Sequence, residues 1–219
     1  MREGAADPGT GHGLELRDVR LTLGVRDLLW VTAAVAPGDT LTVMGPSGSG
    51  KSSLLAFIAG TLAPAFKAHG EVWLSGERID QVPTERRRTG LLFQDDLLFP
   101  HLSVGGNLAF AVPSTVRGRA ERRRVVEEAL KNADLAGFDA RDPATLSGGQ
   151  RARVALLRVL LSRPRALLLD EPFAKLDAAL RAQFRAYVFS EARASGLPIL
   201  LVTHDPADAE AAGGQVITL

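Results

Sequence analysis

The segment GPSGSGKS, residues 45–52, combines glycines with one lysine and one hydroxyl at a spacing suited to phosphate binding. Glycine lets consecutive backbone N–H groups curl around phosphate oxygens, where larger side chains would obstruct them. The Lys51 ammonium could reach terminal phosphates, and the Ser52 hydroxyl could ligate Mg²⁺. A glycine turn with an exposed lysine is the alternative, but the expected strand before and helix after this segment favour a phosphate site. Its expected residues are Gly45, Pro46, Ser47, Gly48, Ser49, Gly50, Lys51, Ser52 and Ser53.

A second chemical pattern, RALLLDEP at residues 165–172, ends an apolar run with two neighbouring carboxylates. Asp170 would lie at the carboxyl end of a strand, where α/β sheets bind ligands. Mg²⁺ takes oxygen ligands, so this carboxylate suits it, directly or through water. Glu171 could polarise an attacking water as a general base. The alternative is a strand that simply ends in a turn, and the phosphate segment upstream makes that reading the weaker one.

Two further polar residues follow apolar strands in the same way. Gln94 comes after GLLF, and His204 comes after ILLVT. Taken alone, each would more often be a boundary residue that is hydrogen-bonded locally. Because the carboxyl ends of parallel strands meet at one edge of a sheet, we expect both to converge with Lys51, Asp170 and Glu171. Gln94 could then contact Mg²⁺ or the attacking water, and His204 could hydrogen-bond the γ-phosphate.

A second glycine turn, LSGGQ at residues 146–150, opens a long amphipathic stretch that leads into the DEP segment. Ser147 suits the N-cap of a helix. Gly148 and Gly149 can offer N–H groups to an anion at the positive helix end, with Gln150 beside them. An ordinary loop would have the same composition. The first glycine segment already supplies one phosphate site, so the turn raises the question of which anion it would bind.

These residues need a sheet to bring them together, and the apolar periodicity predicts one. Strands are expected at residues 14–23, 39–45, 70–79, 88–94, 165–171 and 197–204. Helices are expected at residues 51–63, 103–112, 117–137, after 149, and near 176–194. Apolar strands that alternate with helices indicate a mostly parallel sheet covered by helices. The helical middle, about residues 95–165, reads as a lobe inserted between two strands of that sheet.

Composition excludes several classes of protein. The 219 residues suit one large domain. A net charge of +1 argues against a nucleic-acid-binding surface over the whole molecule, although it leaves room for local basic patches, and no nucleic-acid partner is expected. The absence of cysteine rules out disulfides and thiolate metal sites. No apolar run approaches the roughly 20 residues of a membrane span. Residues 1–13 read as a flexible lead-in without the apolar core of a signal peptide. We therefore expect a cytoplasmic protein whose membrane contact goes through a partner.

The order of the motifs resembles that of the ABC ATPases from about residue 14 onwards: P-loop, Gln94, LSGGQ, LLLDEP, KLD, His204. The resemblance implies a P-loop NTPase fold that binds ATP and Mg²⁺, with an N-terminal antiparallel β region and an inserted α-helical lobe. It divides the chain into a RecA-like core with its β subdomain, residues 14–94 and 166–219, and a helical subdomain, about 95–165, that carries the LSGGQ signature.

In that family two copies pack head to tail, and each signature completes the ATP site of the other copy. By resemblance, Ser147, Gly148, Gly149 and Gln150 would act on the partner's nucleotide, and Asp177 in KLD would couple the two sites. This resemblance explains why a second glycine turn exists. One departure concerns the adenine of ATP. The family stacks the adenine ring on an aromatic residue, and Leu23 stands at the matching position.

The run FQDDLLFPHLSVGGNLAF, which begins one residue before Gln94, resembles the import-type subfamily. That resemblance implies integral-membrane permease subunits as partners, a solute-binding protein indirectly, and a place on the inner face of the cell membrane. Only fifteen residues follow His204 (219 − 204), so we expect no regulatory domain after it. A nucleotide-dependent regulator of a membrane partner, without transport, is the alternative function.

Overall fold

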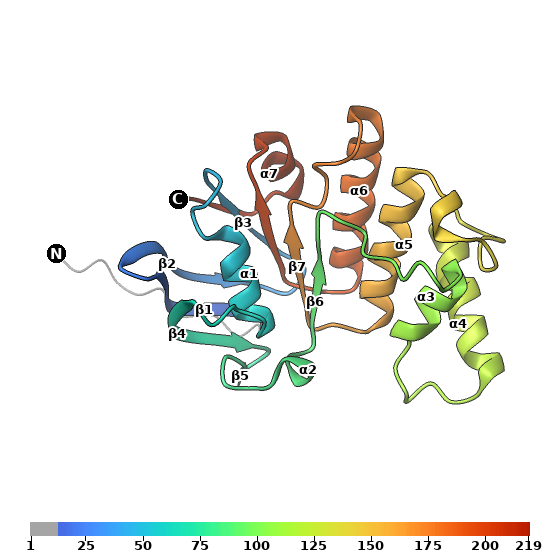
Figure 1. The fold of residues 1–219 in the computed structure, drawn as a ribbon, viewed down its shortest axis with the longest axis horizontal. Helices are drawn as coiled ribbons and strands as arrows, with labels where there is room; N and C mark the ends of the chain where they lie inside the picture. The colour runs from blue at the N-terminus through green and yellow to red at the C-terminus, as the bar shows by residue number, and fades with distance from the viewer. Residues whose placement is uncertain (1–12) are drawn as a thin grey trace.

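A five-stranded parallel sheet forms the centre of the molecule (Figure 1). In the computed structural model, which describes residues 13–219, its strands pair in the order β6-β7-β8-β3-β9, all parallel. They are β3 (Thr40–Met44), β6 (Thr89–Leu92), β7 (Ala166–Asp170), β8 (Ile199–Thr203) and β9 (Gln215–Thr218). Four of these strands were expected. The sequence reasoning missed β9, a largely exposed edge strand without a long apolar run. The expected lead-in lies outside the described residues except for Gly13.

The central strands are apolar throughout because both of their faces are buried. In β7, the Leu168 side chain packs into the core shared with the antiparallel sheet, whereas Leu167 and Leu169 face the helices on the other side. In β8, Leu200 and Leu201 divide between the two cores in the same way. This double burial explains why the strands read as continuous apolar runs rather than as alternating ones.

A second, antiparallel sheet pairs in the order β2-β1-β4-β5, which confirms the expected N-terminal β region. Its strands are β1 (Leu14–Leu23), β2 (Arg26–Val35), β4 (Phe66–Leu74) and β5 (Glu77–Arg78). The sequence reasoning missed β2 and merged β4 with β5 into one strand over residues 70–79. Ser75 and Gly76 separate them, since both have positive φ, 51° and 78°, in a tight turn.

Helix α1 (Lys51–Ala59) packs in the core between the two sheets, where Leu54, Leu55 and Ile58 are buried. It ends before the expected residue 63 because Gly60, at φ 84°, caps it. A short helix, α2 (Thr84–Arg87), precedes β6, and another, α7 (Pro206–Ala212), follows β8. The long helix α6 (Ala178–Ala194) covers the other face of the parallel sheet. Within residues 13–219, no helix has both the length and the apolarity to cross a membrane.

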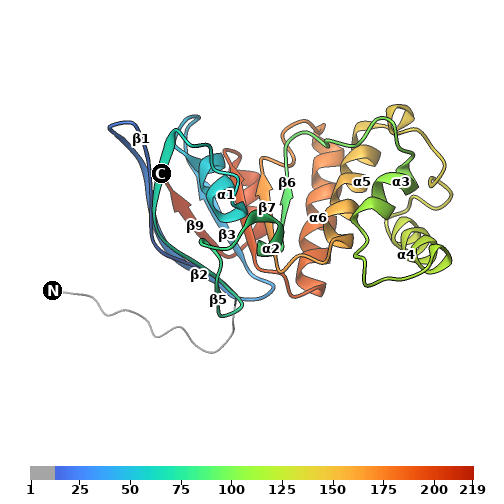
Figure 2. The ribbon, with the colours of Figure 1, turned by 60° about the horizontal axis from the view of Figure 1, so that its bottom comes forward.

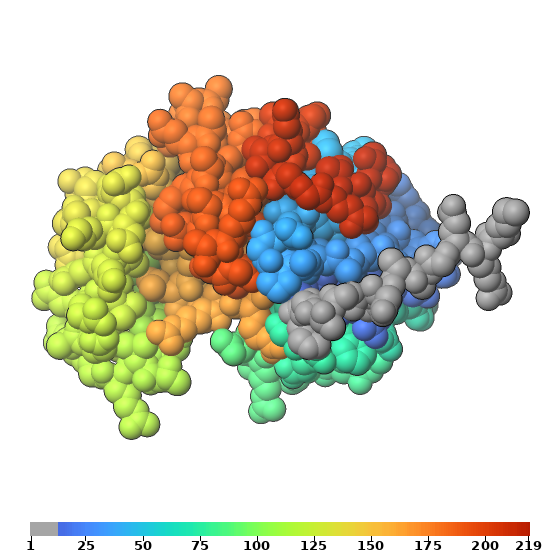
Figure 3. All heavy atoms as spheres, turned by 180° about the vertical axis from the view of Figure 1, so that it is seen from behind, coloured from blue at the N-terminus to red at the C-terminus, as the bar shows by residue number. Residues whose placement is uncertain are grey.

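A helical lobe lies in the chain between β6 and β7 and forms the opposite end of the molecule from the antiparallel sheet (Figures 2 and 3). It contains α3 (Val104–Ala111), α4 (Arg119–Asn132), a 3₁₀ turn (Pro143–Thr145) and α5 (Gly148–Leu161). The lobe has an apolar cluster of its own, which includes Leu108 and Leu130. Helix α5 joins this cluster to the sheet, since Leu157 packs into the lobe and Leu156 packs toward β7.

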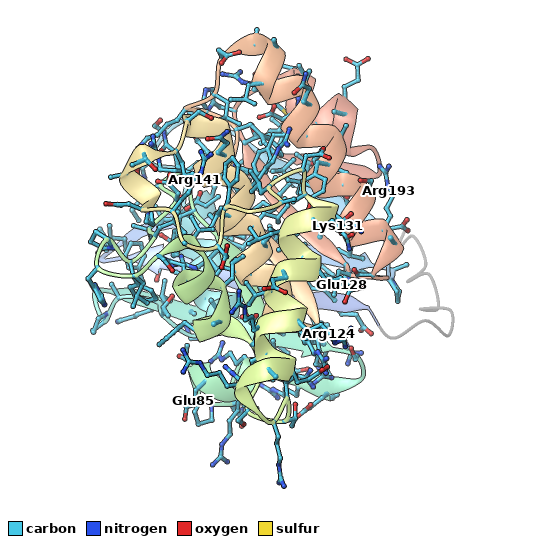
Figure 4. The ribbon with its side chains drawn as sticks, turned by 90° about the vertical axis from the view of Figure 1, so that its right-hand side faces the viewer. Glu85, Arg124, Glu128, Lys131, Arg141 and Arg193 are labelled. Carbon is cyan, nitrogen blue, oxygen red and sulfur yellow. The ribbon has the colours of Figure 1, made fainter. Side chains whose placement is uncertain are left out.

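The outer face of α4 is charged and solvated, as Figure 4 shows for Arg124, Glu128 and Lys131. Arg124 forms exposed ion pairs with Glu121 at 2.8 Å and with Glu128 at 3.4 Å. Exposed ion pairs of this kind contribute little to stability, because solvent screens them. The charges therefore keep the lobe soluble rather than hold it together.

Candidate functional site

The chemically active residues gather where the parallel strands end. Gly45 follows β3, Asp170 ends β7, and His204 follows β8. Since β3, β7 and β8 run in parallel as neighbours, their carboxyl ends lie at one edge of the sheet. Open α/β sheets bind their ligands at this edge.

A pocket of about 200 Å³ opens at this edge around the P-loop, residues 45–52. Gly48 and Gly50 have φ of 81° and 93°, a left-handed backbone conformation that residues with a Cβ disfavour. The pocket is lined by Ser47, Gly48, Gly50, Lys51, Ser52, Ser53 and Glu171. Most of the expected phosphate-binding residues therefore share one cavity with the expected general base.

Two features of the pocket favour an anion, the start of helix α1 and the Lys51 ammonium. Helix α1 begins at Lys51 with no acidic residue in its first turn, so its free N–H groups and dipole favour an anion. The Lys51 side chain is only 6% exposed, and its ammonium donates to the carbonyls of Gly45 at 2.8 Å and Pro46 at 2.9 Å. These contacts hold the positive charge across the loop that would surround the phosphates.

Ser52 and Asp170 come together although they lie 118 residues apart in the chain. The Ser52 hydroxyl donates to Asp170 Oδ1 at 2.9 Å. Burial raises the pKa of the Asp170 carboxyl, while the hydrogen bond from Ser52 opposes that rise. Two hard oxygen donors side by side at the phosphate pocket fit Mg²⁺, which usually takes one or two carboxylates and completes its shell with phosphates and water.

Glu171 and His204 form a second pair at the edge of the pocket, with His204 Nδ1 3.1 Å from Glu171 Oε2. Glu171 has a φ of 45°, in the left-handed region that is rarely populated by non-glycine residues. Such strain clusters at functional sites. The arrangement places a carboxylate, oriented by an imidazole, beside the loop that would hold the terminal phosphate.

Gln94 lies apart from this pocket. It follows β6 and lines a separate cavity of about 80 Å³ at the junction of sheet and lobe, together with Gly148 and Lys175. Among the hydrogen bonds of residues 13–219, none joins Gln94 to Ser52 or Asp170. Its expected contact with Mg²⁺ or the attacking water remains a prediction.

The signature residues do not line the P-loop pocket of their own chain. Ser147 caps α5 in a reciprocal capping box, in which Gln150 N–H donates to Ser147 Oγ at 3.3 Å and Ser147 N–H donates to Gln150 Oε1 at 3.0 Å. The expected N-cap is therefore confirmed. Gly148 faces open space, whereas a Cβ at Gly149 would lie 2.5 Å from the Leu180 methyls. Packing against Leu180 therefore favours glycine at position 149, whereas no neighbour crowds position 148.

Asp177 is the N-cap of α6, since its carboxylate accepts from Leu180 N–H at 3.0 Å. It is exposed, and it does not line the P-loop pocket. Its expected role in coupling two sites remains a prediction.

The sequence reasoning missed two ion pairs around Gln94. Lys175 pairs with Asp95, and Arg151 of α5 pairs with Asp96 at 2.8 Å. These two ion pairs connect the segment after β6 to the segment before α6 and to helix α5. The available signal was the pair of acids directly after Gln94, together with a lysine just before the LD of KLD and an arginine just after LSGGQ.

Leu23 ends β1 with 42% of its surface exposed, where the family resemblance expects an aromatic residue. Another aliphatic side chain lies close to the P-loop: a Cβ on Gly50 would approach Leu28 Cβ to 3.0 Å. Leu28 belongs to β2, a strand that the sequence reasoning missed, so its proximity could not be foreseen.

Comparisons with known proteins found a matching family model and similar relatives. The family model described as ABC transporter matches residues 29–174. The chain is 54% identical over 197 residues to the uncharacterized ABC transporter ATP-binding protein YnjD of Escherichia coli K12, covering 90% of each. It is 43% identical to the thiamine import ATP-binding protein ThiQ of Ruegeria sp. TM1040, covering 86% of this chain and 80% of ThiQ.

A solved structure has the same fold. It is the dimeric post-hydrolysis state of the ATP-binding cassette MJ0796 bound to ADP and Pi, with a TM-score of 0.77, 29% identity and 94% coverage of both chains.

Proposed function

The chain belongs to the ABC transporter family of ATP-binding proteins, and we propose that it hydrolyses ATP to power solute import through separate membrane permease subunits. The observation that carries the proposal is the Ser52–Asp170 contact at the P-loop pocket, with Glu171 on its rim. The import assignment is supported by the name of the thiamine import relative. The permeases would hold the protein on the inner face of the membrane.

The residues divide the work of hydrolysis. The backbone N–H groups of the P-loop and Lys51 would bind the β- and γ-phosphates. Ser52 and Asp170 would hold Mg²⁺, which when bound neutralises charge on the phosphate oxygens. Glu171 would orient the attacking water and accept its proton. His204, 3.1 Å from Glu171, would hydrogen-bond the γ-phosphate and hold that carboxylate in place.

A single copy would carry only part of each site. Ser147 and Gly148 are exposed and lie outside the P-loop pocket of their own chain. The N-terminus of α5 therefore offers its N–H groups to an anion from elsewhere. A second copy packed head to tail would bring the γ-phosphate on its P-loop to this turn. The dimeric state of the MJ0796 structure supports the pairing of two copies.

Mixing two defective variants tests the shared site. Ser147→Arg should block the approach of a partner's phosphate while its own P-loop still binds ATP, and Lys51→Ala should weaken its own P-loop while its signature stays intact. A mixed dimer contains one site with both halves intact. We expect Mg²⁺- and ATP-dependent dimerisation, measured by light scattering, to exceed that of either variant alone.

A control separates function from folding. Ser147→Arg also removes the helix cap, which costs about 1 kcal/mol. Ser147→Asp keeps a good N-cap yet places a negative charge toward the partner's phosphate, so it should also block the dimer. If either variant dimerises with ATP as well as the unmodified protein, the head-to-tail site is wrong.

The transport assignment needs the assembled complex. Co-purified with permease subunits in vesicles, the protein should hydrolyse ATP faster when the solute-loaded binding protein is present, and solute should accumulate inside. Regulated hydrolysis without any solute movement would favour the nucleotide-dependent regulator instead.

A further inference from the structure

Two acidic side chains tie the turn that carries His204 to helix α6. Arg181 of α6 donates to Asp205 at 2.8 Å. One helical turn later, Arg185 donates to Asp208 of α7 at 3.0 Å. His204 immediately precedes the first of these acids. The turn is therefore fastened to a long helix by two arginine–carboxylate contacts, neither of which takes part in the hydrolysis scheme above.

Asp208 is the buried member of this set. It is only 3% exposed, and its second oxygen accepts from the Thr203 hydroxyl at 2.9 Å. Burial raises the pKa of the Asp208 carboxyl, and the hydrogen bond from Thr203 and the nearby Arg185 charge oppose that rise. A buried carboxylate costs folding free energy unless it is paired, and apolar residues often fill such places at less cost. Arg185 and Thr203 supply that pairing, one to each carboxylate oxygen, so Asp208 joins helix α6 to the end of β8.

The Thr203 hydroxyl connects Asp208 to the backbone on both sides of His204. Thr203 is the last residue of β8 and is 1% exposed. Its hydroxyl donates to Asp208 and also accepts from the backbone N–H of Asp205 at 3.0 Å. The His204 side chain is 64% exposed, so packing restrains it little. His204 lies between Thr203 and Asp205, the two residues that this hydroxyl joins, and its ring contacts Glu171 at 3.1 Å.

Helix α6 links this turn to a second part of the site. The helix begins after its N-cap Asp177, and Arg181 also donates to the Leu176 carbonyl at 3.2 Å. The segment before α6 and the turn after β8 are thus attached to the same two turns of helix.

We propose that Asp208 is a positioning residue for ATP hydrolysis. Held by Arg185, it fixes Thr203 at the end of β8. Through Thr203 it presents the His204 imidazole to Glu171 and to the terminal phosphate. This role of Asp208 rests on the proposed role of His204. Asp208 lies outside the P-loop pocket and would keep the His204 imidazole in place.

Proton NMR of the nucleotide-free protein tests the position of the imidazole directly. The chain has four histidines, so each ring resonance can be assigned, and His204→Ala identifies that of His204. Asp208→Asn should shift or broaden the His204 resonance and leave those of His69 and His101 in place. In the same variant, kcat should fall roughly 10-fold or more, while KM for ATP stays about constant, because misplacement by a fraction of an ångström slows chemistry without removing phosphate contacts.

Two further variants keep the test independent of folding defects. Thr203→Val removes only the hydroxyl that links Asp208 to the strand, and it should reproduce the NMR shift and the loss of kcat. Asp80→Asn is the matched control, since Asp80 lies in the segment after β5, has only 8% of its side chain exposed and accepts from Arg78 at 3.0 Å. It should lower thermal stability and leave kcat and the His204 resonance unchanged.

Combination with His204→Ala decides between positioning and a general structural role. If Asp208 acts through His204, Asp208→Asn should cause no further loss of kcat in the His204→Ala background. An equal loss in both backgrounds, an unmoved His204 resonance, or an unchanged kcat in Asp208→Asn and Thr203→Val would overturn the proposal. Normal hydrolysis by His204→Ala alone would instead refute the proposed role of His204.

Discussion

Glu171 combines an assigned chemical role with a strained backbone, and substitution can separate the two. Its φ of 45° lies in the left-handed region, which costs a non-glycine residue about 1–2 kcal/mol. Glu171→Gly removes that strain, but glycine's freedom in the unfolded chain opposes the gain by roughly 0.5–1 kcal/mol. The difference of these two ranges runs from about 0 to 1.5 kcal/mol, so we expect the free energy of unfolding to rise by about 0.8 kcal/mol, the difference of their midpoints. Glu171→Gln keeps the strain and should leave stability nearly unchanged.

Both variants lose the carboxylate, so each should hydrolyse Mg²⁺-ATP roughly 10²–10⁴-fold more slowly. ATP binding should persist in both, because the P-loop contacts remain. Urea unfolding without nucleotide measures the stability difference, and phosphate release measures hydrolysis. A glycine variant no more stable than the glutamine variant would refute the strain argument. Normal hydrolysis by Glu171→Gln would show that Glu171 is not the base.

Three further predictions follow from other parts of the structure. Leu23→Tyr should restore base stacking and strengthen ATP binding relative to GTP by about 1 kcal/mol in competition assays; no change would mean that another residue contacts the base. Gly149→Ala should lower the free energy of unfolding in urea by about 1–3 kcal/mol through crowding against Leu180. Gly148→Ala should not lower it, because position 148 faces open space. Equal effects of the two substitutions would contradict this reasoning. Burial opposes ionisation of Asp80, but hydrogen bonds from Arg78 and a backbone N–H outweigh it and hold the pKa of this carboxyl below its ordinary 3.8. The ionised Asp80 carboxylate should therefore stabilise the fold above pH 3.8, and this stabilisation should be lost as pH falls through the lowered pKa. Asp80→Asn should make the free energy of unfolding depend less on pH in that range. An unchanged acid transition would refute this prediction.

The sequence was most informative where a structural rule acts over a few residues. The strand expected at residues 14–23 is β1 at the same bounds, because alternation of apolar and polar residues matches its two faces. The Ser147 cap was readable because a capping box spans four residues. The expected end of α1 was wrong by four residues, since the left-handed cap at Gly60 stops the helix although apolar residues continue.

The chemistry available at the site could be read from the amino-acid order: a glycine phosphate loop, Asp170, Glu171 and His204, each at the end of an apolar strand. Which of these groups meet could be read only from the folded chain. The Ser52–Asp170 and Glu171–His204 contacts join distant segments, and the packing of Gly149 on Leu180 depends on how two helices lie. The difference lies in the sequence separation over which each rule acts. Periodicity and helix caps involve residues a few positions apart. Side-chain partners depend on the register of strands and the packing of helices that are far apart in the chain.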